Sequence, residues 1–77
     1  MKLTIKYFGL LAEITNSPEE SVDFNGGSVS DLRKELSKKH PGLQQVNYQV
    51  AQDLNIISDE VEILSNEIAL LPPFAGG

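Results

Sequence analysis

The sequence predicts an α+β domain in which one mixed sheet of about four to five strands carries a single main helix on one face. Three observations support this prediction. Apolar and polar residues alternate near the start of the chain, only residues 28–40 show helical spacing, and residues 67–71 are almost wholly apolar. A chain of 77 residues buries only about 60% of the surface of its unfolded state, so we expect one modest core.

The first third of the chain predicts two strands separated by a short helical turn. Every second residue of Lys2–Phe8 is apolar up to Tyr7, which is the period of a strand. Gly9 interrupts this pattern, and Leu10–Ile14 fits one short helical turn. Residues 21–25 alternate again and predict the second strand. The side chains expected to face the core from these two strands are Leu3, Ile5, Tyr7, Val22 and Phe24.

The main helix is expected to begin after Ser28 and to end near His40. Ser28 is a preferred N-cap residue, and Asp31 stands three positions later, where a capping box places its acidic partner. The last turn is basic, which complements the negative end of the helix dipole. Pro41 and Gly42 then stop the helix. The apolar stripe expected to face the sheet consists of Val29, Leu32 and Leu36.

The following residues predict four further strands. Residues 48–52 and 54–57 predict two strands that flank a tight connection around Asp53. Residues 60–63 alternate between acidic and apolar side chains and predict another strand. The last strand is expected after a turn at residues 65–66.

The last strand, Glu67–Leu71, is nearly all apolar and is therefore expected in the centre of the sheet. Pro72 and Pro73 must end it, because proline has no N–H to donate to a neighbouring strand. A central last strand parallel to the first, with one helix across the sheet, is similar to the β-grasp arrangement of ubiquitin-like domains. Since one helix covers only one face, we expect Ala69 and Leu71 to present apolar surface on the other face, where a partner docks.

The negative charge lies entirely in the second half of the chain. Residues 1–40 hold six basic and six acidic side chains, whereas residues 41–77 hold five acidic side chains and no Lys or Arg, which gives the net charge of −5. Acidic surface repels phosphate backbones, so we expect no nucleic-acid partner. A basic protein surface is a better match. The alternative is a solvated acidic surface that serves only solubility.

Cysteine and long apolar segments are both absent from the sequence. Without cysteine, the chain has no disulfide, no zinc–thiolate site, no thiol catalysis and no side-chain persulfide. No apolar run approaches the roughly 20 residues of a membrane span, and the first residues do not resemble a signal peptide. We therefore expect a cytoplasmic protein with no membrane partner.

No group of side chains forms a convincing catalytic or metal site. His40 is the only histidine and is expected to be a charge partner at the helix end, rather than a base or a ligand. The acidic residues 59–62 lack the spacing of a calcium loop. Glycines 26 and 27 lack the lysine of a phosphate-binding loop and are expected to form the turn before the helix. Because Ser17, Ser28 and Ser58 have no plausible base, we expect no catalysis by this chain alone.

The remaining candidate is the end of the sequence, from Pro72 to Gly77. Two prolines favour an extended, stiff segment, and Phe74 is suited to be an apolar anchor in a partner. Gly76 and Gly77 have no Cβ, so they can pass through a channel too narrow for other residues and deliver the carboxylate. A carboxylate needs activation, for example as an acyl-adenylate from which sulfur displaces AMP. Since no nucleotide site is visible in the sequence, the activator must be another protein.

Two motifs carry a resemblance that spans the full chain. Residues 8–13 match a Phe-Ala/Gly motif followed by Arg-Glu, with Ala12 in place of the arginine. Residues 65–77 match a turn, a strand, Pro-Pro, two variable residues and Gly-Gly, with Ser65 and Asn66 departing from the usual Gly-Asp. The sequence thus resembles the small subunit of molybdopterin synthase, a family of sulfur carriers in the ubiquitin-like superfamily.

The resemblance implies a mechanism carried out in other proteins. An adenylyltransferase related to ubiquitin activators would charge Gly77, using ATP and magnesium that this chain does not itself bind. The thiocarboxylate on Gly77 would then enter the large subunit of the synthase and give its sulfur to the pterin precursor of the molybdenum cofactor. The family assembles as two small and two large subunits.

The resemblance also implies a division of the chain. Residues 1–71 would form the β-grasp domain, and residues 72–77 would form a flexible tail. Gly77 would be the catalytic attachment point. The residues expected to bind partners are Leu71, Pro72, Pro73, Phe74, Ala75 and Gly76.

Three alternatives use the same fold. A sulfur carrier of the thiamine pathway shares the diglycine but is usually shorter and lacks the two prolines that lead into the tail. A protein modifier would use the same carboxylate to form an isopeptide bond with lysine. A plain interaction module would have a tail without chemistry.

Overall fold

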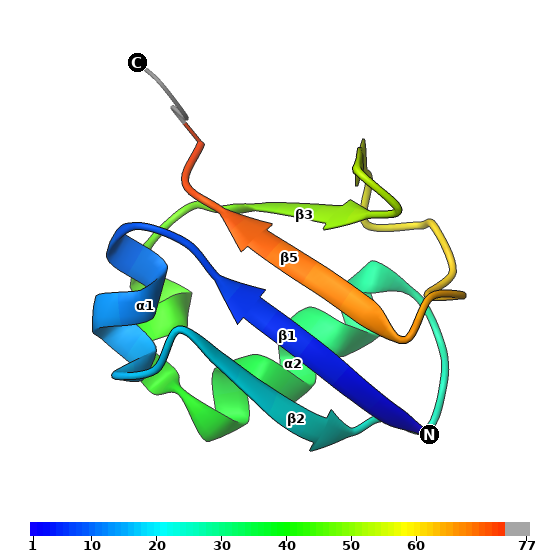
Figure 1. The fold of residues 1–77 in the computed structure, drawn as a ribbon, viewed down its shortest axis with the longest axis horizontal. Coiled ribbons are helices and arrows are strands. Elements are labelled where there is room, and N and C mark those ends of the chain that lie inside the picture. The colour runs from blue at the N-terminus through cyan, green and yellow to red at the C-terminus, as the bar shows by residue number, and fades with distance from the viewer. Residues whose placement is uncertain (74–77) are drawn as a thin grey trace.

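A computed structural model describes residues 1–73, which form a five-stranded mixed sheet packed against one main helix, α2 (Val29–Lys39) (Figure 1). The sheet order is β2-β1-β5-β3-β4, and only β1 and β5 are parallel. The fold class predicted from the sequence, an α+β β-grasp domain, is confirmed. The strands are β1 (Lys2–Tyr7), β2 (Glu19–Asp23), β3 (Gln49–Gln52), β4 (Asn55–Ile57) and β5 (Glu67–Leu71).

The first and last strands form the centre of the sheet, as predicted. In Figure 1 the arrows of β1 and β5 lie side by side and point the same way. Ile5 pairs with Ile68, and Tyr7 pairs with Leu70. Ile5, Ile68 and Leu70 are fully buried against α2, since alternate residues of a strand face the same side. The core therefore lies between these two strands and the helix.

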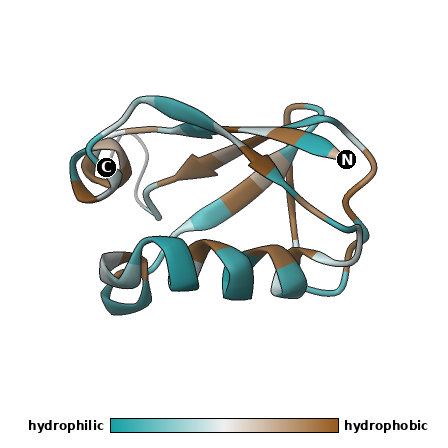
Figure 2. Cartoon of the chain, turned by 90° about the horizontal axis from the view of Figure 1, so that it is seen from below, coloured by the Kyte–Doolittle hydropathy of each residue, from teal (hydrophilic) through white to brown (hydrophobic). Residues whose placement is uncertain are grey.

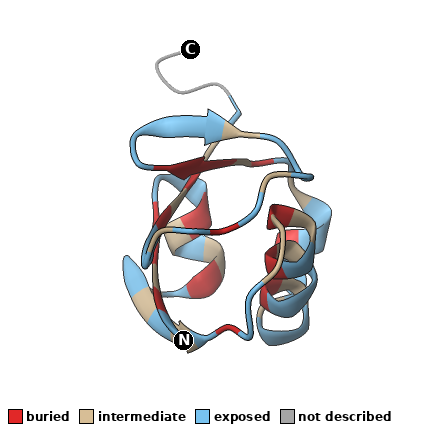
Figure 3. Cartoon of the chain, turned by 90° about the vertical axis from the view of Figure 1, so that its right-hand side faces the viewer, coloured by how far each residue is buried: buried red, intermediate tan, exposed pale blue. Residues whose placement is uncertain are grey.

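Helix α2 begins at the predicted capping box. The Asp31 N–H donates to Ser28 Oγ at 3.3 Å, and the Ser28 N–H donates to Asp31 Oδ2 at 3.0 Å. The predicted apolar stripe is buried along its whole length. Figure 2 shows α2 as a layer of its own beneath the sheet, and Figure 3 shows its buried positions on the side that faces the sheet. The buried residues of α2 are Val29, Leu32 and Leu36.

The strand predicted at residues 60–63 is wrong. This segment lies beside the loop that leads into α2, where Val61 O accepts from Val29 N and Ile63 N donates to Gly27 O, both at 2.9 Å. Only one isolated bridge forms, between Ser28 and Glu62. The ladder cannot continue because its partner turns into the helix directly after Ser28.

The second strand begins and ends two residues earlier than the predicted range of 21–25. It pairs with β1 from Lys6–Glu19 to Lys2–Asp23, so the start of β1 limits its length. Phe24 still reaches the core as predicted, because its N–H donates to Met1 O at 2.9 Å and holds it in line with the strand.

Two shorter helical segments complete the chain. Helix α1 (Leu10–Thr15) is the short turn expected after Gly9. The 3-10 helix η1 (Pro41–Gln45) follows α2 directly, and the sequence analysis did not predict it. Within residues 1–73, no helix combines the length and apolar character needed to cross a bilayer.

Replacing Leu70 by alanine tests the central position of β5. Leu70 is fully buried, so Leu70→Ala should lower the free energy of unfolding by about 2–5 kcal/mol. Leu64 is 75% exposed, and the matched control Leu64→Ala should stay within about 0.5 kcal/mol of the wild type. Urea unfolding followed by circular dichroism measures both changes. Equal losses in the two variants would contradict the assignment.

Candidate functional site

The described part of the predicted tail begins at the end of the central strand. Leu71 is the last residue of β5 and lies opposite Gln49 of β3. Leu71 and Pro72 are half-buried, whereas Pro73 is exposed. The Phe8 N–H donates to Leu70 O at 3.2 Å, which fastens the end of β1 to the end of β5. The tail therefore starts at the end of the central strand, which is hydrogen-bonded to the end of β1.

The other predicted site residues lie outside the part of the chain that the structure describes. They are Phe74, Ala75, Gly76 and Gly77. The attachment point at Gly77, the anchoring role of Phe74 and the division into residues 1–71 and 72–77 stay predictions.

Beside the start of the tail, an apolar groove runs across the sheet face opposite α2. Ala69 of β5 lies opposite Ala51 of β3, which lies opposite Ile56 of β4. The two small alanines leave a hollow between larger apolar side chains. We define the apolar groove by the six apolar residues that line it: Phe8, Ala51, Leu54, Ile56, Ala69 and Leu71. The apolar surface predicted at Ala69 and Leu71 is confirmed.

The outer parts of the groove are unusually exposed for apolar residues. Phe8 is 46% exposed, Ile56 is 58% exposed and Leu54 is fully exposed. Polar residues, including Asp53 and Glu67, form the rim of the groove. An exposed apolar patch bordered by polar side chains is typical of a surface that binds another protein.

Leu54 occupies a backbone conformation that leucine rarely adopts. Asp53 and Leu54 form the two-residue turn between β3 and β4, with φ angles of +53° and +66°. This left-handed conformation costs a residue other than glycine roughly 1–2 kcal/mol. Asparagine and glycine are the usual residues in such turns. Leu54 is fully exposed and therefore contributes no burial to this domain.

Sequence analysis missed Phe8, Leu54 and Ile56 as members of the site. A signal was present for Leu54, because a hairpin turn of two residues without glycine or asparagine is uncommon. Phe8 and Ile56 gave no separate signal, since strand periodicity identifies two faces but does not say which one a helix covers.

Charged residues at the groove are partly neutralised. Lys6 Nζ lies 3.0 Å from Glu67 Oε2 across the β1–β5 pair. The hydrogen bond and the charge of Glu67 raise the pKa of Lys6. Asp53, at the other side of the groove, is exposed at the tip of its turn. The rim is therefore weakly acidic, as the charge distribution of the sequence suggested.

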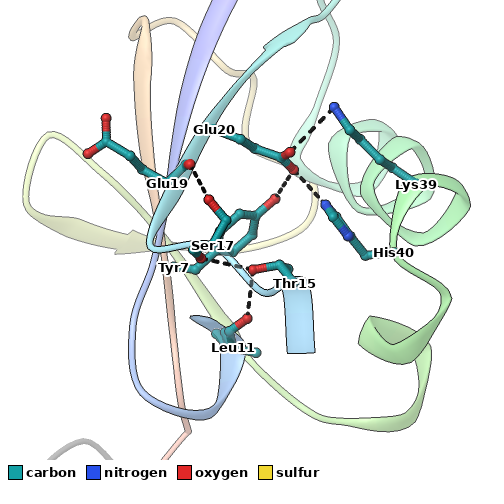
Figure 4. A network of polar contacts seen from close by, with 8 residues as sticks. All are labelled: Tyr7, Leu11, Thr15, Ser17, Glu19, Glu20, Lys39 and His40. Carbon is teal, nitrogen blue, oxygen red and sulfur yellow. Dashed lines mark hydrogen bonds and ion pairs between the residues drawn. The ribbon is translucent and has the colours of Figure 1, made fainter. Parts of the chain in front are cut away.

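On the opposite side of the sheet, a polar cluster connects β1, β2 and the end of α2 (Figure 4). Glu20 Oε1 accepts from the Tyr7 hydroxyl at 2.6 Å and lies 2.7 Å from His40 Nε2. Lys39 Nζ lies 3.4 Å from Glu20 Oε2. His40 thus has a charge partner at the helix end, in agreement with the expectation for this residue.

The polar cluster shifts the pKa of two of its members. Partial burial works to raise the pKa of Glu20, but hydrogen bonds from Tyr7 and His40 and the charges of His40 and Lys39 outweigh it, so the pKa is lowered. Burial, followed by the hydrogen bond to Glu20 and its charge, raises the pKa of the Tyr7 phenol. Each shift keeps Glu20 ionised and Tyr7 protonated, which is the combination that their hydrogen bond requires.

The other predicted candidates have structural roles. Asp59 Oδ1 accepts from Arg33 Nε at 2.8 Å, and Arg33 also lies over the ring of Tyr48. Gly26 and Gly27 form the turn before α2, with φ angles of +91° and +131°. Among residues 1–73, no three acidic or histidine side chains are grouped so that they could hold a metal ion.

Comparison with known proteins gives one family and several relatives. The model of the ThiS family matches residues 5–77. The human molybdopterin synthase sulfur carrier subunit is 31% identical over an alignment of 83 positions. The alignment covers 99% of this chain and 94% of the human protein.

Solved structures share the fold. A putative molybdopterin converting factor subunit 1 from Pyrococcus furiosus has a TM-score of 0.86 at 21% identity, covering 96% of this chain and 99% of its own. Small archaeal modifier protein 1 from Haloferax volcanii has a TM-score of 0.81 at 25% identity, covering 95% of this chain and 98% of its own. A complex of subunits 1 and 2 of molybdopterin-converting factor from Helicobacter pylori matches with a TM-score of 0.67 at 22% identity, covering 100% of both chains.

The polar cluster predicts a pH-dependent stability. Because the pKa of Glu20 is lowered in the folded state, its contribution is present above the unfolded pKa of about 4.3 and is lost as the pH falls through the folded pKa. Tyr7→Phe removes the donor to Glu20 and should cost about 1–3 kcal/mol at neutral pH. At a pH below the folded pKa of Glu20, where this carboxyl group is protonated, the difference from the wild type should be smaller.

Urea unfolding at both pH values measures this difference. Tyr48→Phe is the matched control, since no hydrogen bond found among residues 1–73 involves the Tyr48 hydroxyl. Its difference from the wild type should not change with pH. A loss in Tyr7→Phe that is as large at low pH as at neutral pH would contradict the role of Glu20.

Proposed function

The chain belongs to the ThiS family of sulfur carriers, and we propose that it acts as the sulfur-carrier small subunit of molybdopterin synthase. The observation that carries this assignment is the match to the human sulfur carrier subunit, 31% identical and covering 99% of this chain. The Pro72-Pro73 approach to the diglycine supports it. In this proposal the reactive group is the carboxylate of Gly77, and all catalytic side chains belong to other proteins.

The chemistry proceeds in two steps on that carboxylate. A carboxylate oxygen of Gly77 attacks the α-phosphorus of ATP in an adenylyltransferase, with magnesium present, so that pyrophosphate leaves and an acyl-adenylate forms. A sulfide equivalent then adds to the carbonyl carbon and AMP leaves, which produces the thiocarboxylate. In the large subunit, this sulfur passes to the pterin precursor, and water replaces it on the Gly77 carbonyl carbon, which restores the carboxylate. The absence of cysteine means that no side chain of this protein competes for the sulfur.

The apolar groove supplies the docking surface in this proposal. Leu71 belongs both to the groove and to the strand from which the tail leaves. A partner that covers the groove would therefore hold the start of the tail at a fixed distance from its own catalytic groups. The Helicobacter pylori structure, which is a complex of subunits 1 and 2 of molybdopterin-converting factor, supports a large subunit as one such partner. The adenylyltransferase is the second.

A second candidate function is protein modification. The likeness to small archaeal modifier protein 1 at 25% identity over nearly the whole chain favours it specifically. The same acyl-adenylate would then be attacked by a lysine amine instead of sulfur. A sulfur carrier for thiamine synthesis would share the first two steps and differ only in the acceptor.

Mass spectrometry of the carboxyl-terminal peptide tests the proposed chemistry. After incubation with the adenylyltransferase, ATP, magnesium and a sulfur source, this peptide should show exchange of one oxygen for sulfur. The peptide is measured because oxidation of Met1 gives nearly the same mass change in the intact chain. Deletion of Gly77 should abolish the exchange while leaving the urea unfolding curve unchanged. Exchange of oxygen for sulfur in the chain that lacks Gly77 would refute the carrier function. Lysine-linked conjugates would favour the modifier.

Truncation of Leu54 tests the docking surface. Leu54 is fully exposed in the isolated chain, so Leu54→Ala should not lower the stability. Its affinity for the cognate large subunit should fall by about 1–3 kcal/mol, or roughly 5- to 150-fold in Kd, if the leucine is an anchor in the partner. Isothermal titration calorimetry measures the change, with Leu64→Ala as the control outside the groove. Equal affinities of the two variants would exclude this groove as the interface.

A further inference from the structure

Gly9 and Pro72 meet at the point where the tail leaves the sheet. A Cβ atom placed on Gly9 would lie 3.0 Å from Cγ of Pro72 and 3.9 Å from its Cδ. Cβ atoms seldom approach another carbon as closely as the first of these distances, because the contact is already repulsive. The hydrogen of Gly9 is therefore what allows the proline ring to lie against this backbone.

The backbone around Gly9 is held from several sides. Its φ and ψ angles are +56° and −131°, a combination available to glycine and strongly unfavourable for other residues. Gly9 O accepts from the Ala12 N–H at 3.1 Å, and Phe8 N donates to Leu70 O at 3.2 Å. The turn between β1 and α1 is thus fixed both to the first turn of the helix and to β5.

The turn alone does not require the contact with Pro72. Gly26 also has a positive φ, +91°, but no heavy atom lies within 4 Å of the position that its Cβ would take. At Gly9 two constraints coincide, the backbone conformation and the proline ring. This difference between the two glycines makes the effect of the contact separable by experiment.

We infer that Gly9 is a positioning residue whose exposed backbone seats the ring of Pro72 and so sets the direction in which the tail leaves the domain. This inference rests on the proposed function, since it assigns to Gly9 a role in presenting Gly77. The ring of proline fixes φ near −65°, so a seated ring also fixes the backbone at Pro72. A tail whose first residue is already oriented loses less conformational freedom when it enters a partner.

The Gly9→Ala variant tests this role against the matched control Gly26→Ala. Both variants place alanine at a positive φ, so both should lose stability in urea unfolding. Only Gly9→Ala displaces Pro72. We expect its kcat/KM for adenylation of the terminal carboxylate by the adenylyltransferase to fall roughly 10- to 100-fold. Misplacing a reacting group by about 1 Å has an effect of this order. Gly26→Ala should stay within about twofold of the wild type.

Replacing Pro72 by alanine tests whether the proline ring causes the defect of Gly9→Ala. In a Pro72→Ala background the methyl group of Gly9→Ala no longer meets Cγ, so the double variant should charge almost as well as Pro72→Ala alone. A Gly9→Ala defect of equal size in both backgrounds would overturn the inference, and so would equal charging of Gly9→Ala and Gly26→Ala. If Gly9→Ala does not fold, recovery of folding in the double variant supports the contact. If both variants stay unfolded, the backbone strain at position 9 is sufficient to explain it, and the following measurement on the wild-type chain decides the inference.

A measurement without any enzyme separates this inference from the proposed function. In the wild-type chain, nuclear Overhauser effects should connect the Gly9 Hα protons to the ring protons of Pro72. Their absence would overturn the seating of Pro72 whatever the activity. If they are present but no adenylyltransferase charges Gly77, the proposed function fails while the seating of Pro72 stands.

Discussion

The parallel pairing of β1 with β5 is the constraint on which the rest of the structure depends. It joins the two ends of the chain in the centre of the sheet, with Ile5 opposite Ile68 and both fully buried. Parallel neighbours require a long connection between them, and here that connection contains α2 and the β3–β4 hairpin. The same pairing leaves the end of β5 beside the turn that follows β1. The tail therefore begins at the end of the central strand, whose residues Ile68 and Leu70 are part of the core.

The pleat of β5 lets one strand serve two purposes. Ile68 and Leu70 face α2 and are fully buried, so they stabilise the domain. Ala69 and Leu71 face the opposite side and line the apolar groove. Because these two sets of side chains alternate along five residues, a shift of the strand by one residue would exchange the core and the groove. Stability and the position of the groove are in this way set by one register.

Much of this fold could be predicted because the informative residues act locally. The capping box at Ser28, the alternation in β1 and the prolines that end β5 each depend on neighbours in sequence. The predictions failed where contacts between residues that are distant in sequence determine the local structure. Residues 60–63 alternate like a strand, yet their partner is the start of a helix. The turn at Leu54 and the contact of Gly9 with Pro72 join parts of the chain whose proximity only the sheet order establishes.

Apolar contact and charge would contribute differently to the binding of a partner at the groove. Desolvation of Phe8, Leu54 and Leu71 by a partner would supply affinity in proportion to the apolar area that is covered. The acidic groups near the groove remain solvated, and Glu67 is already paired with Lys6, so they add little to affinity. If the partner surface is basic, as the charge distribution predicts, their main effect would be on the rate of encounter, which decreases as salt increases. Under the proposed function, the carrier would visit an activating enzyme and then a second partner, and fast encounter with moderate affinity would allow it to leave each one.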